Sequence, residues 1–170
     1  MKSVTTPLSP PLLRAIADQF RLSPRSPHGP AHWMRVRHNG LALAPDTGAN
    51  TRVVELFAVF HDSCRENEDH DPRHGPRGAV LAEICRDMGL YTCSDEELEL
   101  LQAACHGHTH EPYHPDPTIA TCWDADRLDL PRVGIIPVPH RLCTVQAKSP
   151  DMIDQARSRA EDWLTRWMGY

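Results

Sequence analysis

Apolar residues recur at helical spacing in several blocks of the chain, and polar or proline-rich stretches separate these blocks. In the first block, for example, Leu12, Ile16 and Phe20 follow one another at intervals of four. The stretches 63–77 and 108–118 are expected to be loops, and prolines 131, 137 and 139 predict an irregular segment near the C-terminus. The expected fold is all-α, a compact bundle of six or seven helices. The predicted helices lie at about residues 11–20, 31–44, 52–62, 78–88, 95–105, 119–130 and 150–168.

The most apolar block is RVVELFAVFHD at 52–62. It leaves almost no polar face before His61 and Asp62, so a helix here is buried on most sides and lies at the centre of the domain. Asn50 or Thr51 can cap its start. His61 and Asp62 are then carried into the interior, where an imidazole and a carboxylate are costly unless they are paired. A divalent cation is a partner that suits both.

Two further polar residues are expected on inward faces of other helices. His32 lies in the first turn of the second predicted helix, and Asp126 falls among the inward positions of the sixth. Together with His61 and Asp62 they form a mixed nitrogen and oxygen set that suits Mn, Fe, Mg, Zn or Co. A divalent metal held in this way lowers the pKa of bound water and holds an anionic oxygen, which phosphoester hydrolysis requires.

Composition narrows the classes of function. The formal charge of −5 and the pI near 6.1 give no basic surface for a nucleic-acid polymer. The six cysteines include no Cys-x-x-Cys pair, which argues against a disulfide framework and a zinc ribbon. The N-terminus lacks the pattern of a signal peptide and no stretch is long enough to span a bilayer, so a cytoplasmic protein without membrane partners is expected. Trp163 and Trp167 lie on the apolar stripe of the last helix, which predicts core packing or a contact within a homodimer.

The order of the polar residues resembles the HD superfamily of metal-dependent phosphohydrolases, in which a histidine, a His-Asp pair and an aspartate follow one another on a helical background. The matching pieces are HWMRV at His32, AVFHD at positions 61 and 62, HGPRGA from His74 and DADRLDL around Asp126. The resemblance implies one HD domain over residues 1–170, with its core at 31–130 and the helix at 150–168 packed on it. It also implies that His32, His61, Asp62 and Asp126 hold a first metal ion.

Binuclear branches of this superfamily bind a second ion through two histidines that lie between the His-Asp pair and the last aspartate. By this resemblance His74 and His108 are the additional ligands and Asp62 bridges the two ions. His106 and His110 are the alternatives to His108. The chain has EPYHP where the related cyclic dinucleotide phosphodiesterases carry a GYP segment, so that substrate is not implied. One or two divalent ions are expected.

Arginines close in sequence to these ligands are the expected phosphate contacts, because a guanidinium matches two phosphate oxygens. Arg65 is assigned with His61 and Asp62 to the catalytic group, whereas Arg73, Arg77 and Arg127 are assigned to substrate binding. Asp124, two residues before Asp126, is expected to point elsewhere and to serve in a supporting hydrogen bond or a cap. The histidines expected to be solvated are His28, His38, His70, His114 and His140.

The function that fits these features is a metal-dependent hydrolase of a small phosphorylated molecule. The substrate is a phosphomonoester or a phosphodiester, and nucleotides are among the candidates. A di-iron HD-type oxygenase and a catalytically silent module that binds metal or nucleotide are the alternatives, because His and Asp ligands serve all three. Substrate choice is expected to rest on the loops 63–77 and 107–117.

Overall fold

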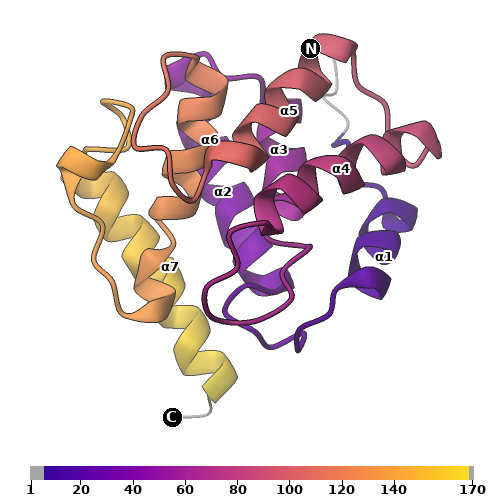
Figure 1. Cartoon of the computed structure of the whole chain (residues 1–170). Helices are drawn as coiled ribbons and strands as arrows, with labels where there is room; N and C mark the ends of the chain where they lie inside the picture. Colours follow the sequence, from indigo (N-terminus) through magenta and orange to yellow (C-terminus); the bar gives the residue numbers. More distant parts are fainter. Residues whose placement is uncertain (1–5, 169–170) are drawn as a thin grey trace.

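The computed structural model describes residues 6–168 and, within them, the side chains of residues 6–162. Over this part the chain forms helices and no strand, which confirms the predicted all-α fold with about seven helices (Figure 1). Two short 3₁₀ helices, η1 at Leu130–Val133 and η2 at Pro139–Arg141, interrupt the irregular segment between the last two α-helices. The α-helices are α1 Pro10–Gln19, α2 Pro30–Thr47, α3 Thr51–Phe60, α4 His74–Asp87, α5 Asp95–Gly107, α6 Pro117–Arg127 and α7 Pro150–Met168.

The central helix is α3, and α1, α2, α4, α5 and α6 all contact it (Figure 1). Every residue from 53 to 60 is buried, including Glu55, which forms an ion pair with Arg37. The side chain of Asn50 accepts hydrogen bonds from two backbone N–H groups of the first turn, which explains why the helix begins there. His61 follows directly after the last turn, so the His-Asp pair lies inside the domain. The apolar residues that precede the pair in the sequence predict this position.

Most helix boundaries differ from the prediction by one to four residues, and the start of α4 differs most. α4 begins at His74 rather than at Gly78, so His74 is a helical residue and not part of a loop. Pro76 is compatible with this start, because the N–H groups of the first turn have no partner within a helix. α2 continues through Pro45, past its expected end, and Gly48 closes it in the left-handed conformation.

Two glycines of α4 allow it to approach both α3 and α5. A Cβ atom at Gly78 would collide with the carbonyl oxygen of Phe60 in α3, and one at Gly75 would collide with the carbonyl oxygen of Cys105 in α5. Only a residue without a side chain permits these contacts. The close packing places His74, the neighbour of Gly75, between the ends of α3 and α5.

α7 packs against α2 and η1. The contact includes a second apolar cluster, which is separate from the main core around α3, and a polar contact to α2. Arg159 of α7 donates to the Asn39 side-chain oxygen of α2 at 2.8 Å. Trp163 and Trp167, predicted to pack in the core or in a homodimer, lie outside the described side chains. Among the described helices, none combines the length and the hydropathy that crossing a membrane demands. The buried members of the second apolar cluster are Leu43, Leu128, Leu142, Ala147 and Ala156.

Candidate metal centre

Six histidine and aspartate side chains from five helices converge in the interior. They form two groups, and within each group the ligand atoms lie within 4.8 Å of one another. All six residues are predicted ligands, and the structure brings every one of them together. Each group can hold a metal ion. We call His32, His61 and Asp126 the first cluster, and Asp62, His74 and His108 the second cluster.

The helix ends position these side chains. The ligand residues lie at or next to one end of each of five helices, and these ends gather around the C-terminus of α3, so that residues far apart in sequence share one small volume. Polar side chains tolerate this interior because helix ends carry backbone groups that can hold them. His32 lies in the first turn of α2, His61 and Asp62 follow α3, His74 opens α4, His108 caps α5, and Asp126 is the last but one residue of α6.

The four cluster histidines present the same ring nitrogen to the centre. In each ring Nδ1 faces an oxygen of a backbone carbonyl or a carboxylate, which can only accept, so Nδ1 carries the proton. Nε2 of the neutral ring is therefore a lone pair directed inward, as in metal-binding histidines generally. The Nδ1 acceptors are Asp129 Oδ2 for His32 at 2.7 Å, the Phe57 carbonyl for His61 at 3.1 Å, the Cys105 carbonyl for His108 at 2.8 Å, and the Asp71 carbonyl for His74.

As a result, the Nε2 atoms that face each other across the centre are both hydrogen-bond acceptors. Nε2 of His32 lies 3.0 Å from Nε2 of His61, and Nε2 of His74 lies 2.9 Å from Nε2 of His108. Two lone pairs at this separation repel each other unless a cation lies between them. Two ligands about 2.1 Å from one ion are about 3.0 Å apart when their bonds meet at a right angle. The donor set of each cluster therefore fits a divalent cation.

Asp62 faces both clusters, one oxygen to each. Its Oδ1 lies 3.1 Å from Nε2 of His74, and its Oδ2 lies 3.5 Å from Nε2 of His32. Asp126 belongs to the first cluster, with Oδ1 3.3 Å from the same nitrogen of His32. The two oxygens of Asp62 are thus placed as those of a carboxylate that bridges two ions.

Burial and neighbouring groups shift the pKa values of these residues. Burial lowers the pKa of His61 to about 3, so this ring is neutral at pH 7. Burial also opposes the charged form of His108, but the Asp62 and Asp126 carboxylates and the Cys105 carbonyl together outweigh it and raise the pKa of that ring. Burial would raise the pKa of Asp62 and Asp126, yet the histidines around them, His61 foremost beside Asp62 and His32 beside Asp126, keep the pKa of both carboxyls below the usual range. The two carboxylates are therefore ionised, and a divalent cation bound here would offset their charge.

A buried ion pair behind the first cluster was not found from the sequence. Asp129 accepts from Nδ1 of His32 and also forms two hydrogen bonds with the Arg35 guanidinium, at 2.7 and 2.9 Å. Arg35 is buried, although an arginine ordinarily lies at the surface. The pairing fixes the orientation of the His32 ring. The available signal was the spacing of Asp129, three residues after Asp126 and thus close to it on a helical turn.

The prediction that His28 is solvated is wrong. Its ring is half-buried, lines the cavity of the site, and lies with Nδ1 2.8 Å from Oδ2 of Asp62. Its carbonyl accepts from the indole N–H of Trp33 at 2.8 Å, which holds the loop against α2. Proline-rich surroundings at residues 23–30 hid this position, because they predict only a loop. His38, His70 and His140 are exposed, as expected, and so are His106 and His110, whereas His114 is half-buried.

The predicted phosphate-binding arginines lie in different surroundings. Arg65 is buried beside the second cluster, with one guanidinium nitrogen 3.6 Å from Oδ1 of Asp62 and another donating to the Asp69 carbonyl at 2.7 Å. Arg127 lines the cavity, but its guanidinium donates to backbone carbonyls on two loops. Arg73 and Arg77 do not line the cavity, since Arg73 is exposed and Arg77 binds the Cys64 carbonyl and Asp71.

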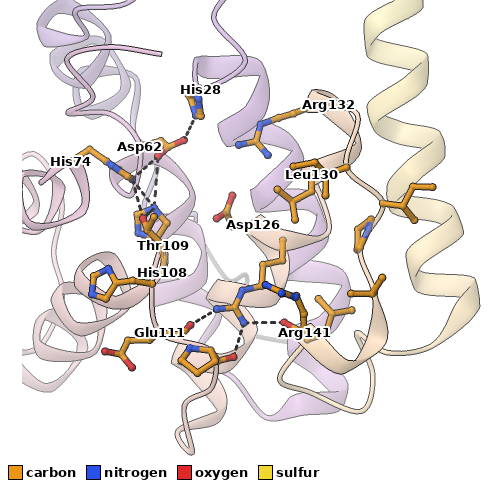
Figure 2. A pocket seen from close by; sticks show the side chains of 18 of the residues that line it. His28, Asp62, His74, His108, Thr109, Glu111, Asp126, Leu130, Arg132 and Arg141 are labelled. Atoms are coloured by element: carbon orange, nitrogen blue, oxygen red, sulfur yellow. Dashed lines mark hydrogen bonds and ion pairs between the residues drawn. The ribbon is translucent and has the colours of Figure 1, made fainter. Parts of the chain in front are cut away.

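A cavity of about 840 Å³ opens over the two clusters (Figure 2). Its inner wall is formed by His28, Asp62, Arg65, His74, His108 and Asp126. Its outer wall is formed by the lining residues of the segment 130–142, which includes η1 and η2. Asp124, expected in a supporting role, accepts hydrogen bonds from the backbone N–H groups of Cys143 and Thr144 and so holds the end of this segment.

Compared with known proteins, the chain matches no family model, no curated protein and no solved structure.

Proposed function

We propose that the protein is a metal-dependent phosphohydrolase of the HD type that acts on a small phosphorylated molecule. One observation carries the proposal: two groups of buried acceptor atoms share Asp62, and every histidine in them has its Nδ1 proton committed elsewhere. The order of the residues along the chain, with His-Asp after the central helix, agrees with the HD pattern. Mn, Fe, Mg, Zn and Co all suit this mixed donor set.

The reaction is hydrolysis at phosphorus. A water oxygen forms a bond to phosphorus, the bond between phosphorus and the alcohol oxygen breaks, and the leaving oxygen takes up a proton. Divalent cations held by the two clusters would lower the pKa of water towards neutrality and offset the charge of the phosphoryl oxygens. Arg65 contributes a guanidinium that its bond to the Asp69 carbonyl holds beside the second cluster, where it can bind a phosphoryl oxygen. The histidines keep their orientation because their Nδ1 protons are bound.

The buried surroundings of the clusters support electrostatic catalysis. Five of the six candidate ligand residues are buried on the inner wall or behind it, with His32 and His61 fully enclosed. Charges in such a site are screened less than at the surface, so a guanidinium or a cation there acts more strongly on a developing negative charge. The open side of the cavity leaves room for the substrate above the clusters.

The experiment that tests the proposal begins with metal content. Protein stripped with a chelator is reloaded with each candidate ion, and phosphate release is measured over a panel of phosphomonoesters and phosphodiesters. We expect release only from loaded protein, and a loss of more than about a hundredfold in Asp62→Ala, since changes outside the ligand sphere already cost about 10- to 100-fold. His106→Ala is the matched control, because His106 is an exposed histidine at the end of the same helix that positions His108.

Two outcomes would contradict the proposal. Unchanged turnover in Asp62→Ala would show that the clusters do not carry the reaction. Oxygen consumption together with the paramagnetic signal of a mixed-valence iron pair, without phosphate release, would assign the site to oxygenase chemistry instead.

A further inference from the structure

The outer wall of the cavity exposes apolar side chains to the space above the clusters. Ile135, Ile136 and Val138 all line the cavity, and they are 53%, 64% and 38% exposed. Apolar side chains this large usually pack in a core, and three of them on four consecutive positions form a continuous apolar surface. Gly134 and the prolines around them keep the segment out of helix and sheet, so the side chains are presented by an extended backbone.

This wall offers little flat surface on which a nucleobase could stack, since His140 carries its single aromatic ring and aliphatic side chains make up much of the rest. Among the residues of the described chain that line the cavity, none is Phe, Tyr or Trp, so no large aromatic face is available for stacking. Pro137 adds no backbone N–H to the wall, and Leu130 and Leu142 extend the apolar surface at either end. Base edges need hydrogen-bonding partners as well as a flat surface. An aliphatic group needs neither hydrogen-bonding partners nor a flat surface.

Among the arginines that line the cavity, Arg132 lies on the same segment as the apolar surface and faces the clusters. The Arg132 side chain is buried, and its guanidinium donates to the carbonyls of Pro27 and Asp129 at 2.8 and 3.1 Å. Figure 2 shows this guanidinium directed to the space that the Asp126 carboxylate also faces. Because two backbone carbonyls hold it, it is ready to bind an anionic oxygen without losing side-chain freedom. No carboxylate belongs to the outer wall between residues 130 and 142.

We infer that the substrate is a phosphomonoester of an apolar, aliphatic alcohol, whose phosphate lies between the clusters and Arg132 and whose chain lies on Ile135, Ile136 and Val138. This inference rests on the proposed function and names its substrate class. The cavity volume of about 840 Å³ leaves space for a chain of several carbons beside the phosphate. Nucleotides, which the sequence left among the candidates, fit the wall less well.

The test uses two matched series. Alkylphosphonates from ethyl to octyl, which water does not hydrolyse, are titrated by calorimetry into Mn²⁺-loaded protein, and the corresponding alkyl phosphates are assayed for phosphate release. We expect the affinity and kcat/KM to rise about two- to fourfold with each methylene that reaches the wall. Adenosine 5′-monophosphate is expected to fall at least tenfold below hexyl phosphate. Ile136→Ser should flatten the dependence on chain length, whereas Val145→Ser, a change at a 79% exposed position away from the cavity, should leave it intact.

The outcomes separate this inference from the proposed function. A chain-length dependence in the calorimetry without any phosphate release supports the apolar site and overturns the phosphohydrolase. Phosphate release that is independent of chain length, or that favours the nucleotide, leaves the phosphohydrolase in place and overturns the inference. An unchanged slope in Ile136→Ser overturns it as well.

Discussion

The two walls of the cavity are built in opposite ways. The inner wall consists of polar side chains set at or near the ends of α-helices, and its His74 and His108 rings are oriented by bonds from Nδ1 to backbone carbonyls. The outer wall is an irregular segment with apolar side chains, and proline and glycine determine its course. The inner wall can change little without losing its geometry, whereas the outer wall can exchange side chains freely. Under the proposed function, the contrast would assign chemistry to rigid helices and specificity to a loop, as expected where reacting groups need precise placement.

The clusters differ from each other in one respect that a metal count can reveal. Asp62 faces both clusters, while Asp126 faces the first. We expect Asp62→Asn to reduce the bound divalent ions from two per chain to none, and Asp126→Asn to reduce them from two to one. Elemental analysis of loaded and desalted protein measures this directly. Equal loss in both variants would argue against the bridging position of Asp62.

A second change removes a charge behind the inner wall without touching a ligand. Asp129→Asn leaves Arg35 buried beside an uncharged amide, and breaking a buried pair in this way costs about 3–5 kcal/mol of unfolding free energy. The same change frees the His32 ring, so we expect the affinity of the first cluster for its ion to fall about 10- to 100-fold. Denaturant unfolding and metal titration measure the two effects. Restored metal affinity in Asp129→Glu would identify the loss as one of orientation.

A third change acts through the backbone of α4. Gly75→Ala forces the added methyl against the Cys105 carbonyl, to which His108 also donates, and should cost about 1–3 kcal/mol by overpacking. Since His74 and His108 belong to the second cluster, the ion held there should be weakened more than the first. Val80→Ala, at an exposed position of the same helix, is the control. Equal weakening of both ions would mean that α4 does not position the second cluster separately.

The smallest effect is expected on the outer wall. Ile136→Ser removes an exposed side chain, so we expect the free energy of unfolding to change by no more than about 0.5 kcal/mol and the metal content to stay the same. Thermal unfolding and elemental analysis of the same preparation provide both numbers. A loss of metal in this variant would mean that the outer wall also helps to hold the ions, contrary to the distinction drawn between the two walls.

Much of the candidate metal centre could be predicted, because the spacing of apolar residues around its members indicates which positions are buried. The buried run before His61 and Asp62 predicts the central helix, and the apolar spacing around His32 and Asp126 places them on inward faces. The structure brings these residues together with His74 and His108, although their role as ligands stays a prediction. Helical periodicity is a strong signal for such positions, since burial repeats along the sequence.

The remaining features depend on contacts between distant segments, which no local pattern encodes. The sequence around Arg35 is typical of a surface residue, and its burial depends on the ion pair with Asp129, which lies far along the chain. His28 lies in a proline-rich loop whose course is set by its contact with Asp62, and Arg132 gains its position from the Pro27 carbonyl. Arg73 and Arg77 are close to the ligands in sequence but not in the cavity, because sequence distance does not report direction.

The fastening of the outer wall at both ends has a practical consequence. Asp124 and Arg127 of α6 hold its far end, through the N–H groups of Cys143 and Thr144 and the carbonyl of Arg141, while the Leu130 carbonyl binds the N–H of Ile135 at the near end. Positions 136–138 therefore form a cassette with anchored borders. If the proposed function holds, randomising these three codons should yield a library in which the metal centre is shared and only the preferred organic group varies.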